Sequence, residues 1–107
     1  MRQSELARAM LVAVKESLGE DWGEAKDWAK PEIQRLARVL VDIGKLVSQE
    51  KMTPAEAKAI LKIHRNTTQT VMLTVKGMGL IAVENAVNAA VGAIRDVVNT
   101  AVGFRLV

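Results

Sequence analysis

The sequence predicts an all-α protein, a helical bundle made of a two-helix hairpin followed by a long C-terminal helix. Three observations support this prediction. Half of the 107 residues are hydrophobic but only 3% are aromatic, so Ala, Val, Leu and Ile dominate the apolar content. The chain contains only two prolines. Its apolar residues recur at steps of three and four, which is the helical period. The length suits a single helical domain, residues 1–107.

The first predicted helix covers residues 4–30. Ser4 is a suitable N-cap. The apolar stripe after it has helical spacing: Leu6, Ala7, Met10, Leu11, Val14 and Leu18. Gly19 interrupts the stripe, but the spacing continues to Ala29, so we expect the glycine to lie inside the helix. The helix is expected to end just before Pro31, because a proline disfavours the helical conformation of the residue before it.

The second predicted helix covers residues 31–50 and completes the hairpin. Pro31 fits the first turn of a helix, where its missing N–H costs nothing. Glu32 beside it favours the positive end of the helix dipole. The apolar face then consists of Ile33, Leu36, Ala37, Leu40, Ile43 and Val47. These two helices should therefore bury one face each against the rest of the bundle.

The third predicted helix covers residues 54–104 and has the clearest start signal of the chain. Thr53 as N-cap, Pro54 at the first helical position and Glu56 at the third form a capping box. The stripe that follows keeps steps of three and four as far as Phe104. One continuous helix of this span is roughly 75 Å long.

A kink or a break at Gly77-Met78-Gly79 is the alternative to continuity. Each glycine costs about 1 kcal/mol relative to alanine in a helix interior. A β-branched stretch at residues 67–71 also weakens the helix before that point. A break would give four helices, and a monomeric four-helix bundle would then become feasible.

The C-terminal half is poor in charge and has a wide apolar surface. From Asn66 onward the charged residues are Lys76, Glu84, Arg95, Asp96 and Arg105. A continuous third helix is too long for the hairpin to cover, and monomers rarely expose large apolar surfaces. We therefore expect a coiled-coil-like seam that completes the bundle by oligomerisation, as a homodimer or larger, or by binding another helical protein. The predicted interface residues are Leu80, Val83, Val87, Ala90, Ile94, Val97, Ala101 and Phe104.

The sequence contains no signal for catalysis, a metal or a cofactor. Cysteine is absent, which excludes disulfides and thiolate metal sites. His64 is the only histidine and has no carboxylate three or four residues away, so we expect no catalytic role for it. The first residues lack the layout of a signal peptide, which favours a cytoplasmic location. The charges in the C-terminal half argue against a membrane span.

One cluster of cations offers a different function. Lys58, Lys62 and Arg65 share a face at the start of the third helix and are candidate phosphate-binding residues. The net charge of +3 is low for a dedicated nucleic-acid binder. No aromatic residues are interleaved for base stacking. The more conservative interpretation of this cluster is a solvated helix face.

The sequence thus favours a non-enzymatic, self-associating bundle with a structural, scaffolding or interaction role. Its assembly is expected to use the Ala/Val-rich C-terminal helix. Two alternatives remain: a weakly basic nucleic-acid-binding protein, and an amphipathic protein that coats a membrane or storage-granule surface.

Overall fold

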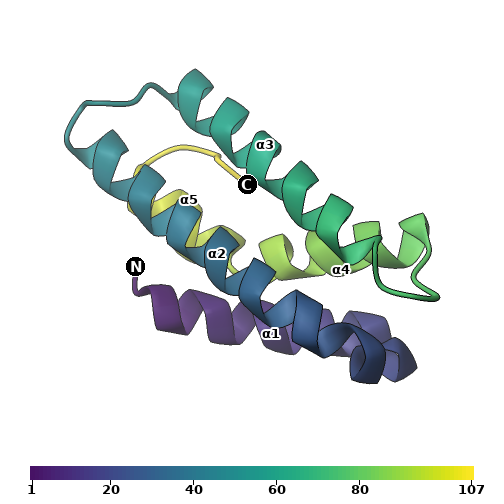
Figure 1. Cartoon of the computed structure of the whole chain (residues 1–107). Helices are drawn as coiled ribbons and strands as arrows, with labels where there is room; N and C mark the ends of the chain where they lie inside the picture. Colours follow the sequence, from purple (N-terminus) through teal and green to yellow (C-terminus); the bar gives the residue numbers. More distant parts are fainter.

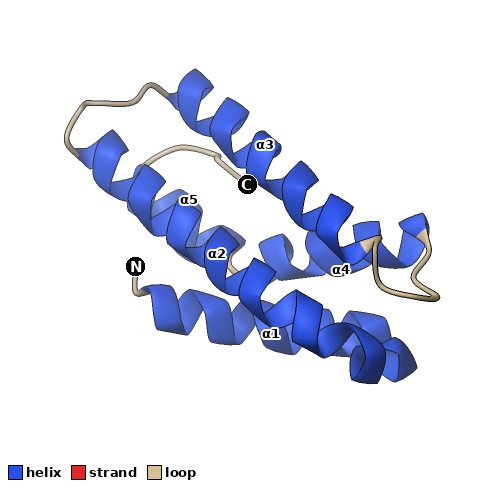
Figure 2. Ribbon diagram, in the orientation of Figure 1, coloured by secondary structure: helices blue, strands red, loops and turns tan.

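The all-α prediction is confirmed in the computed structural model, which describes all 107 residues and contains no strand. The helices are α1 (Gln3–Leu18), α2 (Trp22–Ser48), α3 (Pro54–Met72), α4 (Leu80–Ala93) and α5 (Arg95–Val102), with a 3₁₀ turn at Gly19–Asp21 between the first two. The bundle measures 43 × 22 × 19 Å (Figure 1). Helices make up nearly all of it, joined by short loops (Figure 2).

The predicted boundary between the first two helices is wrong. The chain turns at Gly19, and α2 runs without interruption through Pro31. Gly19 ends α1 at φ +55° and ψ −118°, a conformation that residues with a Cβ rarely adopt. The glycine that was expected inside a helix is therefore the residue that ends it.

Pro31 lies in α2 on the solvent side of the helix. It removes the hydrogen bond that its N–H would donate to the carbonyl of Asp27, at a cost of about 3 kcal/mol. Pro31 and Asp27 are both exposed, so water can bind the freed carbonyl. The opposite face of α2 is buried along its length by Ala25, Ala29, Ile33, Leu36, Ala37, Leu40 and Ile43. This packing outweighs the local cost and keeps the helix continuous.

The predicted start of α3 is confirmed. The Thr53 hydroxyl accepts a hydrogen bond from the Glu56 N–H at 3.1 Å, and the Glu56 carboxylate accepts one from the Thr53 N–H at 3.0 Å. Pro54 occupies the first turn. These two bonds satisfy backbone and side-chain groups that would otherwise need water.

A continuous helix over residues 54–104 is wrong, and the alternative of a break at Gly77–Gly79 is confirmed. Helix α3 ends at Met72, and α4 begins at Leu80. Gly77 adopts φ +86°, which glycine tolerates best. The last helical segment bends again at Ile94 before α5, and Gly103 ends α5 in the left-handed conformation.

The break at the glycines allows the C-terminal half to fold back onto the hairpin. Helix α4 runs back along α1 and makes its main packing contacts there (Figure 1). Helix α2 lies between α1 and α3, and it also contacts α5. The core therefore draws on every α-helix, for example through Met10, Leu36, Leu61, Val87 and Val98.

Asn99 fixes the last residues of the chain against α5. Its side-chain oxygen accepts hydrogen bonds from the N–H groups of Leu106 at 2.9 Å and Val107 at 3.0 Å. Its amide donates to the carbonyl of Val107 at 3.1 Å. Leu106 is buried as a result. None of the helices has the length and hydrophobicity that a membrane span requires.

Candidate functional site

The predicted interface residues separate into two groups in the folded chain. Those at the centre of the seam are buried in the monomer's own core: Val83, Val87, Ala90 and Ile94. They face the hairpin because α4 folds back onto α1. A second copy cannot reach these four side chains unless the core opens, so the structure removes them as contact residues for an assembly of folded monomers.

The outer members of the predicted seam remain accessible, but they lie on separate helices. Leu80 begins α4, whereas Val97 and Ala101 are on α5; all three are exposed. Phe104 is partly buried after the end of α5. The bend at Ile94 therefore divides what the sequence predicts as one continuous stripe.

An apolar tip occupies one end of the bundle, at the connection between α3 and α4 (Figure 1). We use this name for Leu73, Leu80 and Ile81. Leu73 directly follows α3, and the other two residues open α4. Ile81 is 74% exposed and Leu80 54% exposed. Only Leu80 belongs to the predicted interface, because the sequence pattern did not show which residues of the connection would face solvent.

The three predicted phosphate-binding residues converge. Lys58, Lys62 and Arg65 line one cavity of about 360 Å³ on α3, beside Leu106. Both lysines are exposed, and neither forms an ion pair. The Arg65 guanidinium donates to the side-chain oxygen of Asn88 on α4 at 2.8 Å. Burial lowers the pKa of Arg65.

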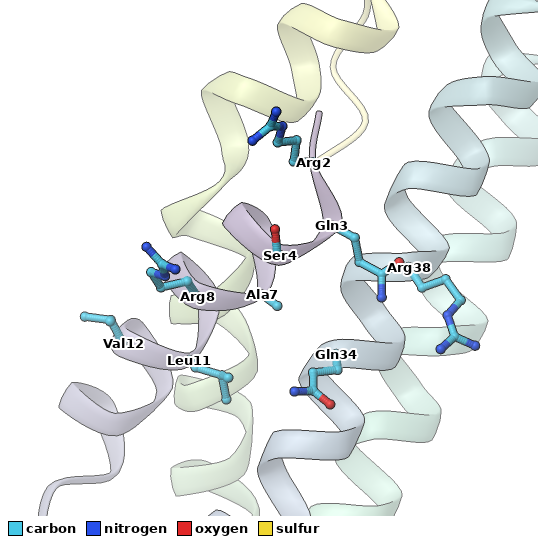
Figure 3. Close-up of a pocket in the computed structure, with 9 residues that line it drawn as sticks. All are labelled: Arg2, Gln3, Ser4, Ala7, Arg8, Leu11, Val12, Gln34 and Arg38. Atoms are coloured by element: carbon cyan, nitrogen blue, oxygen red, sulfur yellow. The ribbon is translucent and has the colours of Figure 1, made fainter.

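A larger groove lies between α1 and α2, with a volume of about 880 Å³ (Figure 3). Its arginines come from both helices, Arg2 and Arg8 from the α1 side and Arg38 from α2. The other polar residues on its walls are Gln3, Ser4 and Gln34, and its apolar residues are Ala7, Leu11 and Val12. No acidic residue lines the groove. We refer to it as the arginine groove.

Sequence reasoning missed the arginine groove because its cations are far apart in the chain. Arg8 and Arg38 are separated by a hairpin turn whose position was predicted incorrectly. Had the turn been placed at Gly19, the helix faces that carry Arg8 and Arg38 would have been predicted to lie side by side. Gly19 itself was the available signal, because glycine commonly ends helices in a conformation with positive φ.

A polar network joins α2 to α3 beneath the surface. Arg35 donates to the Glu32 carboxylate at 3.0 Å, to the Thr68 hydroxyl at 2.9 Å and to the His64 carbonyl at 3.3 Å. It also lies 2.7 Å from Nδ1 of His64. A guanidinium only donates, so Nδ1 accepts and the imidazole carries its proton on Nε2.

Thr68 is the only polar residue that is fully buried in the protein, and this network satisfies its hydroxyl. No buried side-chain nitrogen or oxygen lacks a partner. His64 therefore has a structural partner in Arg35. The network positions α3 on α2.

The comparisons with known proteins give no family assignment. No protein-family profile matches the chain, and neither the curated proteins nor the solved structures contain a significant match. The structure brings together no group of three or more His, Cys, Asp or Glu residues that could hold a metal ion. The functional argument therefore depends on the surfaces described above.

Proposed function

We propose that the protein is a non-enzymatic helical interaction module that associates with further copies of itself through the apolar tip. The observation that supports this proposal is the exposure of Leu73, Leu80 and Ile81 at the two ends of one connection. Leu80 and Ile81 are adjacent in the chain and both exposed, and exposed apolar residues that gather at one place on a small protein are typical of interaction sites. Dispersed single apolar residues would need no such explanation.

The size of the tip sets the expected strength of the association. Full burial of one apolar side chain gains about 1.5–3 kcal/mol. A two-fold dimer would bury the tip residues of both copies, and two-fold symmetry is the commonest arrangement of homo-oligomers. Association itself costs roughly 4–15 kcal/mol. The gain and the cost are similar, so we expect a dimer that dissociates on dilution.

Sedimentation velocity over a range of protein concentrations tests this proposal. The wild type should shift from monomer to dimer as its concentration rises. Ile81→Ser combined with Leu80→Ser should keep it monomeric, because both changes remove apolar surface that only an interface would bury. Ile63→Ser is the matched control: Ile63 is 62% exposed on α3 and away from the tip. A wild type that stays monomeric, or equal effects of the control and the tip variant, would contradict the proposal.

Nucleic-acid binding is a second candidate function, favoured by the convergence of Lys58, Lys62 and Arg65 on one cavity. Three phosphate contacts predict that log K falls against log salt with a slope of about −2 on a single-stranded oligonucleotide. Lys58→Gln with Lys62→Gln should reduce that slope. The control Lys26→Gln with Lys30→Gln removes the same charge from the first half of α2. If both variants lose the same affinity for the oligonucleotide, the binding reflects attraction to net charge alone.

A further inference from the structure

Arg65 carries a partly buried positive charge that no acidic group of the chain neutralises. Burial lowers its pKa, because removal from water disfavours the charged guanidinium. Charges that a protein removes from water are normally paired with an opposite charge. The chain has two ion pairs, and neither involves Arg65. Its guanidinium makes one side-chain hydrogen bond, to the neutral oxygen of Asn88 at 2.8 Å. A cation in this state favours an anion from outside the chain.

The cations around Arg65 lie in one row on α3. Lys58, Lys62 and Arg65 follow one another at steps of four and three residues, so neighbouring Cβ atoms are about 5–6 Å apart. The row spans about 10 Å along the helix axis. All three cations line the same cavity, and the other polar residues of its lining are the neutral Asn66 and Gln69. A row of cations without a carboxylate suits a ligand whose phosphates also follow one another in a line.

Asn88 contacts this row from a different helix. It belongs to α4, whereas the three cations belong to α3. Asn88 does not line the cavity, so a ligand in the cavity meets the Arg65 guanidinium and not the Asn88 amide. The guanidinium can only donate, which fixes the oxygen of the Asn88 side chain toward Arg65. One of the three cations is therefore held in place by α4.

An arginine that is already held binds an anion better than a free one. A long side chain loses rotamer freedom when it contacts a ligand, and this loss weakens binding. The hydrogen bond to Asn88 removes part of that freedom before the ligand arrives. The two lysines of the row are exposed and form no ion pair. Arg65 is thus the cation of the row that the fold itself orients.

We propose that Asn88 is a positioning residue for phosphate binding at the α3 cavity. It holds the Arg65 guanidinium in the row, where the three cations contact neighbouring phosphates of one single-stranded nucleic acid. This role rests on nucleic-acid binding as the function of the cavity. Asn88 touches no phosphate and acts only through Arg65. The site consequently needs α4 packed on α3, so it forms only after the chain has turned at Gly77.

Fluorescence anisotropy with a labelled oligothymidylate at low, fixed salt tests this role. Asn88→Ala should weaken binding at least about threefold, because Arg65 is no longer oriented before it contacts the phosphate. Arg65→Gln should weaken binding more, because it removes the contact itself. In the Arg65→Gln background, Asn88→Ala should change the affinity by less than about twofold, since Asn88 then has no cation to hold. The matched control is Asn85→Ala, which changes an exposed asparagine of α4 outside the cavity lining and should leave the affinity unchanged.

The possible outcomes separate this role from the function on which it rests. If the wild type does not bind the oligonucleotide, nucleic-acid binding by the cavity and the role of Asn88 both fail. If the wild type binds and Lys58→Gln with Lys62→Gln weakens it, but Asn88→Ala does not, only the positioning role is refuted. An equal loss on Asn88→Ala with and without Arg65 would also refute it, because a purely structural asparagine acts independently of the arginine. Asn88 is exposed, so the fold should persist, which circular dichroism checks. If Asn88→Ala fails to fold, Asn88→Ser should weaken binding in the same way, and an unchanged affinity would overturn the role.

Discussion

Replacing Arg35 with methionine should destabilise the fold, because this part-buried side chain joins α2 to α3. Methionine keeps much of the apolar stem and removes the guanidinium. The change breaks the hydrogen bonds to Glu32, Thr68 and His64. The Thr68 hydroxyl is fully buried and no other partner is present for it. A buried group that loses its partner carries its full desolvation cost.

The expected loss is about 2–3 kcal/mol of unfolding free energy. Each hydrogen bond to a charged group contributes about 1.5–3 kcal/mol, but these bonds share one guanidinium and are not additive. The Arg35 side chain is 29% exposed, so water replaces part of what is lost. Urea unfolding followed by circular dichroism measures the loss. In a chain of this size it corresponds to a fall in Tm of roughly 10–20 °C.

Two further variants make this test specific to the network. Arg38→Met changes an exposed arginine one turn away on α2 and should alter stability by less than about 0.5 kcal/mol. Thr68→Val removes only the hydroxyl and should cost about 1 kcal/mol. If Arg35→Met costs less than about 0.5 kcal/mol, or its effect adds independently to that of Thr68→Val, the network does not hold α3 on α2.

Other substitutions test the remaining features of the fold. Pro31→Ala should stabilise the protein by at most about 3 kcal/mol, because it restores a helix hydrogen bond, and any loss of stability in urea would refute this. Ile94→Ala should cost about 2–5 kcal/mol, because Ile94 is buried in the monomer, and the loss should not depend on protein concentration. Gly77→Ala should cost about 1–2 kcal/mol at φ +86°, and an unchanged Tm would contradict the turn geometry. The Thr53 N–H, with a smaller contribution from its hydroxyl, holds the pKa of Glu56 below its usual 4.5. Glu56 therefore contributes stability above pH 4.5 that is lost as the pH falls through its native pKa. The unfolding free energies of Glu56→Gln and the wild type should differ only above the native pKa of Glu56, which urea unfolding at several pH values measures.

Local signals in the sequence were sufficient where neighbouring residues decide the structure. The capping box at Thr53 and Glu56 was predicted correctly, because its donors and acceptors lie within four residues of one another. The helical class followed from periodicity and composition. The convergence of Lys58, Lys62 and Arg65 also followed from one helix face, since residues three and four apart are neighbours.

Predictions failed where a local preference competed with distant packing. Pro31 was expected to end a helix, but the buried face of α2 holds the helix together past it. Gly19 was expected inside a helix, because the apolar period continues across it, and it ends α1 instead. Periodicity cannot tell whether a stripe continues in one helix or restarts in the next with the same phase.

By itself, the sequence determined that this chain is helical, where α3 begins, and that its C-terminal half must bury an apolar surface. Only the tertiary structure decided what covers that surface. Gly77 reverses the chain, α4 packs on α1, and Val83, Val87 and Ile94 are buried within one copy. The pairing of Arg35 with Thr68, 33 residues apart, was also beyond local reasoning. The physical reason is common to both: burial depends on contacts between segments far apart in the chain, and these exist only once the turns have been placed.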